Sequence, residues 1–364
     1  MARHKYYAPE FRLEINEYLI PASLRAAITS VSWNNDAEAA DKVEFSIHDP
    51  DEYWFNDPLL APENQLSLSL GYAGELEQVF SGEITAQNAS FQQGGGITLK
   101  IEAMDRSHRL MRGSRERSFQ LQPDSTIISR IAQEHGLIPQ VDAGSAFLAP
   151  LAEFLGHARR QANQSDFEFL TQIATEMGVQ FGVEGNTLMI KKIVETAVAF
   201  DADWGRMLIS FNPRITTVGQ IDAVSVRVWL REVNKNLIVT VGWDWENERL
   251  KLDTRTEGSS ADSARNGNVL SLVNQPLRDP TEFVEVTNRA LSELKNRLNN
   301  RITGSGSLIG DTRIRIGALV NLQGIGDTFS GRYRISSATH TLDSSGYKVN
   351  FQGNQEIIPD FMEL

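Results

Sequence analysis

The chain has 364 residues, 41% of them hydrophobic and 23% charged, with a formal net charge of −12 and no cysteine. This length suits two or three globular domains with apolar cores. The absence of cysteine excludes disulfides, thiolate nucleophiles and cysteine-based metal sites, and the acidic balance argues against stable nucleic-acid binding. No apolar run approaches the roughly 18 residues of a membrane-spanning helix, and the first sixteen residues lack the apolar core of a secretory signal. We therefore expect a protein made in the cytoplasm, without membrane insertion.

Residues 1–115 are predicted to form an antiparallel β-domain. In residues 65–72, three leucines alternate with serines, which is the period of two expected of a half-buried strand. Residues 97–102 repeat this alternation, and the glycines at 94–96 supply the turn of a hairpin.

Residues 116–198 are predicted to form a small α/β domain. One helix is expected to begin at Asp124 and to end at Gly136. A second helix opens at Ser165, and Glu168 completes the capping box three residues later.

Residues 199–364 are predicted to form a second β-domain, which includes a polar loop and a long helix at about 254–303. Asp279 is the expected N-cap of that helix. The apolar stripe of the helix, expected to pack against the strands of the same domain, comprises Leu291, Leu294 and Leu298. The fold class predicted for the whole chain is mainly β with an α/β insert.

The sequence offers little that is typical of catalysis. The six histidines are scattered without metal-ligand spacing, and neither a nucleophile elbow nor a phosphate-binding loop is present. Carboxylates cluster at residues 49–52 and 244–248, but neighbours on a strand point to opposite faces, so solvated loops are the favoured interpretation. We expect no catalytic residue, no cofactor and no metal, and hence no enzyme.

One charged segment stands out from the acidic background. Residues 106–117 contain five arginines and a single acid. Two interpretations remain open: an electrostatic contact with an acidic neighbouring protein or protomer, or a linker whose arginines pair locally. The candidate interface residues are Arg106, Arg109, Arg112, Arg115 and Arg117.

The C-terminal residues 311–351 carry an ordered set of turn glycines and packing aromatics: Gly324, Gly326, Phe329, Ser330, Gly331, Tyr333, His340, Gly346, Tyr347 and Phe351. In its order and spacing, this set resembles the signature of the phage late control protein D family, the tail hub proteins of contractile phages. Residues 79–85, 110–119 and 164–178 resemble further segments of that family, so that the resemblance spans nearly the whole chain.

The resemblance implies two tail-tube-like antiparallel β-barrels per protomer, in addition to the α/β domain. It also implies a structural role: a homotrimeric baseplate hub that joins the hexameric tail tube to a trimeric spike. Related VgrG-type spikes continue into a further barrel and a needle. Because only thirteen residues follow Phe351, we expect the spike to be a separate protein.

The expected partners are two further copies of the chain, the spike, the tail tube protein and other baseplate proteins. The expected location is the cytoplasm during assembly, and then the virion tail or an extracellular contractile particle. The alternative is a tail-associated peptidoglycan hydrolase, which would need an acid/base pair or a metal set in a cleft.

Overall fold

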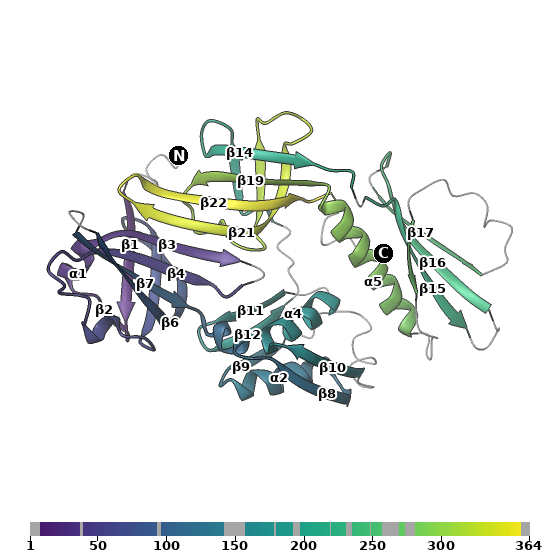
Figure 1. Cartoon of the computed structure of the whole chain (residues 1–364). Helices are drawn as coiled ribbons and strands as arrows, with labels where there is room; N and C mark the ends of the chain where they lie inside the picture. The colour runs from purple at the N-terminus through teal and green to yellow at the C-terminus, as the bar shows by residue number, and fades with distance from the viewer. Residues whose placement is uncertain are drawn as a thin grey trace.

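Antiparallel strands make up most of the molecule, and the largest element is one sheet of thirteen strands (Figure 1). The structure is a computed structural model, and it describes residues 8–36, 39–92, 96–141, 157–177, 180–191, 197–218, 220–230, 235–247, 249–256, 269–273 and 281–357. The main path of the sheet runs, in spatial order, through β14 (Leu208–Ile215), β19 (Ile302–Ile309), β22 (Gly346–Gln355), β21 (Gly331–Asp343), β3 (Ile28–Asp36), β4 (Lys42–His48), β7 (Gly96–Met104), β6 (Glu75–Gln92), β5 (Gln65–Tyr72), β1 (Pro9–Ile15) and β2 (Tyr18–Leu19).

The N-terminal and C-terminal parts of the chain meet in the middle of this sheet. β3 pairs antiparallel with β21, so that Trp33 lies opposite His340. A single apolar core underlies both parts, and it includes Leu13 and Ile47 from the N-terminal strands and Phe351 from β22. The mainly-β class is confirmed. Two β-barrels were expected, and hydrogen bonding between β3 and β21 joins the two β-rich regions into one continuous sheet.

The predicted alternation of β5 is confirmed. Leu66, Leu68 and Leu70 are buried against the core, whereas the serines between them are partly exposed. Of the expected hairpin glycines, Gly96 has a φ of +78°, and residues 94 and 95 lie outside the described residues. The remaining elements around the sheet are α1 (Ala22–Ala27), the 3₁₀ helix η1 (Pro58–Leu60), and the strands β13 (Phe200–Asp203) and β20 (Leu319–Gln323) beside β21.

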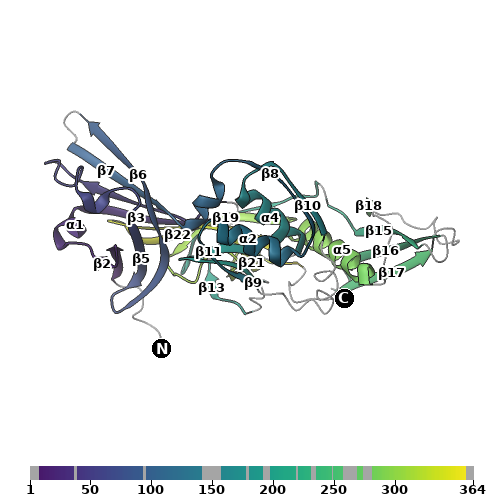
Figure 2. The ribbon, with the colours of Figure 1, turned by 90° about the horizontal axis from the view of Figure 1, so that it is seen from below.

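The α/β insert follows β7 and forms a separate body beside the main sheet, between the N-terminal strands and the C-terminal helix (Figure 2). The predicted capping box is present, because the Glu168 N–H donates to Ser165 Oγ at 3.2 Å and the Ser165 N–H donates to Glu168 Oε2 at 2.7 Å. The elements of the insert are β8 (Arg115–Gln122), α2 (Asp124–Glu134), β9 (Ile138–Val141), β10 (His157–Gln164), α4 (Asp166–Met177), β11 (Gln180–Glu184) and β12 (Thr187–Lys191).

The described strands of residues 199–364 contribute to two sheets. Besides the C-terminal strands of the main sheet, they build a four-stranded sheet in the order β17 (Arg249–Thr256), β16 (Lys235–Asp244), β15 (Ala223–Leu230) and β18 (Val269–Val273). Helix α5 (Thr281–Asn299) covers this second sheet. The predicted stripe of Leu291, Leu294 and Leu298 is buried there against Val224 and Trp243. The expected N-cap, residue 279, lies outside the described residues.

Candidate functional site

The arginine segment forms the crossover from the main sheet to the insert. It consists of the 3₁₀ helix η2 (Arg106–Met111), a turn at Gly113, and the start of β8. Asp105 caps η2, because its carboxylate accepts a hydrogen bond from the Ser107 N–H at 3.0 Å. The five candidate arginines therefore project from one connection and reach different surroundings.

Arg106 and Arg109 attach the crossover to the main sheet. Both guanidinium groups bind Glu83 on β6, and the distance from Arg106 Nε to Glu83 Oε1 is 3.2 Å. Arg106 also donates to Asn186 Oδ1 at 2.8 Å, in the turn between β11 and β12. Only about an eighth of the Glu83 side chain is exposed, so this contact lies largely out of solvent. These two arginines join three segments that are distant in the sequence.

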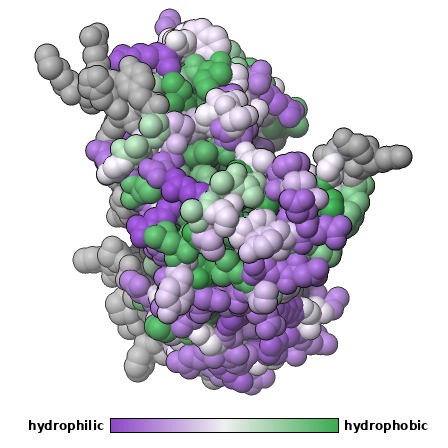
Figure 3. All heavy atoms as spheres, turned by 90° about the vertical axis from the view of Figure 1, so that its left-hand side faces the viewer, coloured by the Kyte–Doolittle hydropathy of each residue, from purple (hydrophilic) through white to green (hydrophobic). Residues whose placement is uncertain are grey.

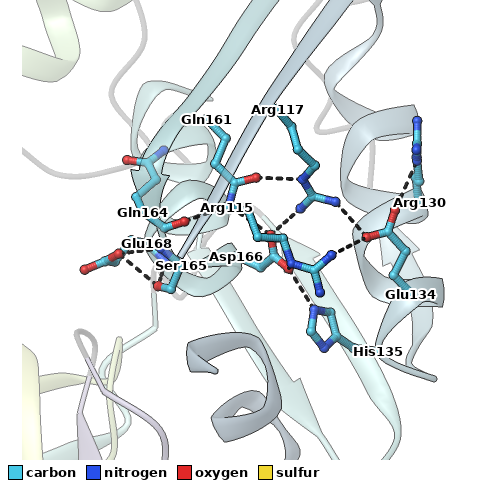
Figure 4. A network of polar contacts seen from close by, with 10 residues as sticks. All are labelled: Arg115, Arg117, Arg130, Glu134, His135, Gln161, Gln164, Ser165, Asp166 and Glu168. Atoms are coloured by element: carbon cyan, nitrogen blue, oxygen red, sulfur yellow. Dashed lines mark hydrogen bonds and ion pairs between the residues drawn. The ribbon is translucent and has the colours of Figure 1, made fainter. Parts of the chain in front are cut away.

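Arg115 and Arg117 enter a polar network inside the insert, which Figure 4 shows. At its centre lies Asp166, the first residue of α4, whose side chain is 2% exposed. Arg115 Nε lies 3.2 Å from Asp166 Oδ2, and Arg117 binds Asp166 Oδ1. Arg117 also pairs with Glu134, at the end of α2, at 2.6 Å. The network thus connects β8 with both helices of the insert.

A histidine and a glutamine complete the surroundings of Asp166. His135 Nε2 donates to Asp166 Oδ2 at 2.8 Å, and Gln161 Nε2 donates to Oδ1 at 2.9 Å (Figure 4). Burial alone would raise the pKa of Asp166, but these hydrogen bonds and the charges of Arg117 and Arg115 hold that pKa below its usual value. The ionised carboxylate is therefore the form that the insert is built around.

Arg112 differs from the other four arginines. It is exposed, and its Nη2 lies 3.2 Å from Nε2 of His108. His108 Nδ1 lies 2.7 Å from the carbonyl oxygen of Asp105, which can only accept, so Nδ1 carries the proton and Nε2 accepts from Arg112. Of the two interpretations of the segment, local pairing describes the other four arginines. Most of these four side chains are partly buried rather than solvated. An interface role stays a prediction, and Arg112 is the residue best placed for it.

Two carboxyl groups lie close together where the crossover leaves the sheet, Asp105 buried and Asp41 partly buried. The Asp105 N–H donates to the Asp41 carbonyl at 2.9 Å, and the Asp41 carboxylate accepts both contacts of Asn35 Nδ2, at 2.8 and 2.9 Å. Burial, together with the nearby charge of Asp105, raises the pKa of Asp41 to about 7. Burial raises the pKa of Asp105 to about 6. Sequence reasoning missed this pair, because sixty-odd residues separate the two aspartates and only the fold brings them together.

The two carboxylate clusters are not simply solvated loops, and that expectation was wrong for one member of each. Asp49 is buried and accepts the backbone N–H groups of the loop that follows it, and Asp244 is buried and pairs with Lys251 at 3.0 Å. The hydrogen bond from Asn247 and the contact with Lys251 lower the pKa of Asp244. The donors to Asp49 belong to Tyr53, Trp54 and Phe55, at 2.8, 2.9 and 3.0 Å.

The C-terminal signature contains a fully buried histidine. His340 Nε2 lies 2.8 Å from the carbonyl of Ile314, so Nε2 donates, and Nδ1 accepts the hydroxyl of Tyr347 at 2.7 Å. Burial lowers the pKa of His340 to about 4, which keeps the ring neutral. The Tyr347 ring lies on Gly310, where a Cβ atom would come within 2.2 Å of it. This histidine is a satisfied strand residue with a structural role.

The glycine pair of the signature serves a turn, as predicted. Gly324 and Gly326 have φ values of +77° and +84°, a region that favours glycine. The Ser330 N–H donates to the Gly326 carbonyl at 2.8 Å, and the Tyr333 hydroxyl donates to Phe329 at 2.8 Å. Within the described ranges, no group of three or more His, Asp or Glu side chains could hold a metal ion, and no helix is long and apolar enough to cross a membrane.

The architecture is that of solved phage tail proteins. The structure is similar to the 43 kDa tail protein of prophage MuSo2 from Shewanella oneidensis, with a TM-score of 0.66, 15% identity, and coverage of 98% of this chain and 100% of that one. It is also similar to a tail protein from Neisseria meningitidis, with a TM-score of 0.63, 12% identity, and coverage of 97% and 98%. The E. coli c3393 protein, a component of the type VI secretion system, gives a TM-score of 0.56 at 11% identity over 94% of this chain and 76% of that one.

The sequence itself matches the family model of the Alg8 N-terminal domain over residues 28–344. The chain therefore belongs to the Alg8 N-terminal domain family. No curated protein matched the sequence.

Proposed function

We propose that the chain is the structural baseplate hub of a contractile phage tail, or of a phage-tail-like injection system, and a relative of the late control protein D family. In this role, three copies join a hexameric tail tube to a separate trimeric spike. The protein is made in the cytoplasm and ends in the virion tail or in an extracellular contractile particle.

The observation that carries the proposal is the pairing of β3 with β21. It sets two β-rich regions of one chain side by side in a single sheet. Three such chains present six β-rich regions around an axis, which suits a sixfold tube, while the trimer itself keeps the threefold symmetry of a spike. The match in fold to tail proteins over nearly the full length of both chains supports the same role.

A structural role also agrees with the polar residues that sequence reasoning weighed for chemistry. His340, Asp49 and Asp166 each have their hydrogen-bonding capacity taken up by neighbouring groups of the fold. A peptidoglycan hydrolase would instead present an acid and a base to a substrate.

The test is a mass measurement in solution, followed by mixing with the tube and spike proteins encoded beside the gene. We expect a trimer, alone or in the presence of the spike, and a ternary complex with both partners. A protein that stays monomeric with both partners present would contradict the hub. A saturable activity on peptidoglycan that is lost on changing one carboxylate would establish the hydrolase instead.

A further inference from the structure

Two stretches of strand in the main sheet have a neighbouring strand on one side only among the described residues, one in each β-rich region. Figure 1 shows β14 along the upper border of the molecule, beyond β19. Among the described strands, β14 pairs along its length only with β19. At the other end, β5 covers β6 only as far as Glu83, and residues 86–92 of β6 pair only with β7 in the described part of the chain.

The two edges run in opposite directions. Eight strands lie on the path from β14 to β6, and all seven pairings along it are antiparallel. An even number of alternating strands leaves the first and the last antiparallel to each other. When the β14 edge of one copy meets the β6 edge of the next, the new pair therefore continues the same antiparallel pattern.

At both edges, the residues whose backbone N–H and C=O groups point outward have their side chains on the same face of the sheet. Thr216 donates to the Arg301 carbonyl directly opposite, so by alternation the backbone groups of Phe211, Pro213 and Ile215 point to the open edge. On β7, the Ile97 carbonyl accepts from the Asp49 N–H, so the backbone groups of residues 97, 99 and 101 face β4, and those of Gln87, Ala89 and Phe91 on β6 point away from β7. The Gln87 side chain donates to the Leu60 carbonyl, so the uncovered part of this edge is centred on Ala89 and Phe91. In both strands these residues lie on the core side of the sheet.

The side chains at the two edges are also of the same kind, apolar on the core side of the sheet and polar on the outer side. On the core side, Ile215 is 46% exposed on β14 and Phe91 is 62% exposed on β6, because the sheet ends beside them. Figure 3 shows further apolar patches between polar residues at the N-terminal end of the molecule. On the outer side, a shallow hollow beside β14 is lined by uncharged polar groups, among them Ser210, Asn212 and Asn350, and β6 presents Asn88 and Ser90 on that side.

We infer that β14 of one copy pairs with residues 86–92 of β6 in a second copy, head to tail. Pairing covers Ile215 and Phe91 and keeps polar side chains against polar ones. Pro213 lacks an N–H and removes one donor from the ladder. Two β14 strands paired with each other would place two prolines near the centre and lose two donors, so the unlike pair is favoured. The closure of the ring at three copies rests on the proposed hub function, whereas the edge pairing does not.

Cross-linking tests the inference directly, because the parent chain has no cysteine. Ser90→Cys and Asn212→Cys are made singly and mixed, and a short bis-maleimide is added at a concentration where sedimentation shows an oligomer. We expect cross-linked dimers in the mixture and not in either variant alone. A matched mixture of Ser90→Cys with Thr341→Cys, on an interior strand of the same face, should remain uncross-linked. The double variant S90C/N212C should give a ladder that stops at three chains.

The outcomes of the cross-linking experiment distinguish a failure of the edge pairing from a failure of the proposed hub function. An oligomer without the Ser90–Asn212 cross-link overturns the edge pairing and leaves the hub standing. Cross-linking of Asn212→Cys with itself overturns it in favour of a twofold pair. A ladder that continues past three chains supports the edge pairing and contradicts the trimer. A chain that neither oligomerises nor cross-links at any concentration overturns both.

Discussion

The α/β insert and the unit made of α5 and the four-stranded sheet are held together by different chemistry. In the insert, a carboxylate that is 2% exposed lies at the centre of arginine, histidine and glutamine donors. In the helical unit, Leu294 and Leu298 pack on Val224 and Trp243. Hydrogen bonds fix direction as well as distance, whereas apolar contacts depend mainly on area and volume. The insert should therefore respond to charge and pH, and the helical unit to volume and polarity.

The largest effect is expected from a charge in the apolar contact. Leu294 is fully buried, so Leu294→Asp places an unpaired carboxylate against Val224 and Trp243 and should cost about 4 kcal/mol of unfolding free energy. Denaturant unfolding measures the loss, and hydrogen exchange should place it in β15, β16 and α5. The control Leu294→Met nearly conserves volume and should cost less than about 1.5 kcal/mol. Equal stability of Leu294→Asp and the parent would show that the stripe is not buried.

The next effect concerns the centre of the polar network. Asp166→Asn keeps the shape but leaves Arg117 and Arg115 without their shared carboxylate, which should cost about 3 kcal/mol at pH 7. The exposed pair of Glu116 with Arg160 lies in the same insert, so Glu116→Gln is a matched control, expected to cost at most about 1 kcal/mol.

The pH dependence of this loss follows from the lowered pKa of Asp166. A carboxyl group whose pKa is lower in the folded protein contributes stability above its unfolded pKa of about 3.9 and loses it as pH falls through the folded value. The difference between the parent and Asp166→Asn should therefore stay constant from pH 8 to about pH 5. A difference that disappears by pH 6 would mean that the carboxylate is not held in its ionised form.

The two regions also differ in how far their structure could be predicted. The stripe of α5 and the capping box of α4 were predictable, because each depends on residues within one or two helical turns. That the stripe would pack on a separate four-stranded sheet was not predictable, since alternation alone does not assign strands to one sheet or another. The partners of the arginines were missed for the same reason: Glu83 lies 26 residues from Arg109, and Asp166 lies 49 residues from Arg117.

A third effect belongs to the junction between these regions and the main sheet. The pKa values of Asp41 and Asp105 are raised, to about 7 and about 6, so their ionisation opposes folding. This cost is small near pH 4, where both groups are largely protonated in the unfolded chain as well, grows as pH rises from about 4 to about 7, and is complete above that range. Asp105→Asn keeps an acceptor for Ser107 and removes one charge.

We therefore expect Asp105→Asn to be more stable than the parent by about 1 kcal/mol at pH 8, and equal to it near pH 4. Thermal unfolding measured across this pH range gives the comparison. An equal gain in stability at pH 4 and at pH 8 would have to arise from the cap of η2 rather than from the removed charge. A loss of stability at pH 8 would show that the ionised carboxylates of Asp41 and Asp105 are stabilising.

The smallest effect on stability, and the most informative for assembly, is expected at Arg112. The other four arginines of the crossover bind carboxylates of their own chain, whereas Arg112 is exposed and contacts His108. Arg112→Glu should change the unfolding free energy by less than about 0.5 kcal/mol, as exposed substitutions usually do. If the crossover meets an acidic neighbour, the same change should weaken assembly at low salt. Arg206→Glu, at another exposed arginine, is the control that should leave assembly unchanged.

Ionic strength sharpens this last comparison. An exposed charge contact is screened over about 8 Å at physiological salt, so assembly of the parent should weaken as salt rises, whereas assembly of Arg112→Glu should weaken less. Sedimentation at several protein concentrations, with and without the tube and spike proteins, measures both series. Parallel salt curves for the parent and the variant would show that no neighbour contacts Arg112. In that case the five arginines would serve only contacts within their own chain, and the interface would lie elsewhere, as the inferred edge pairing expects.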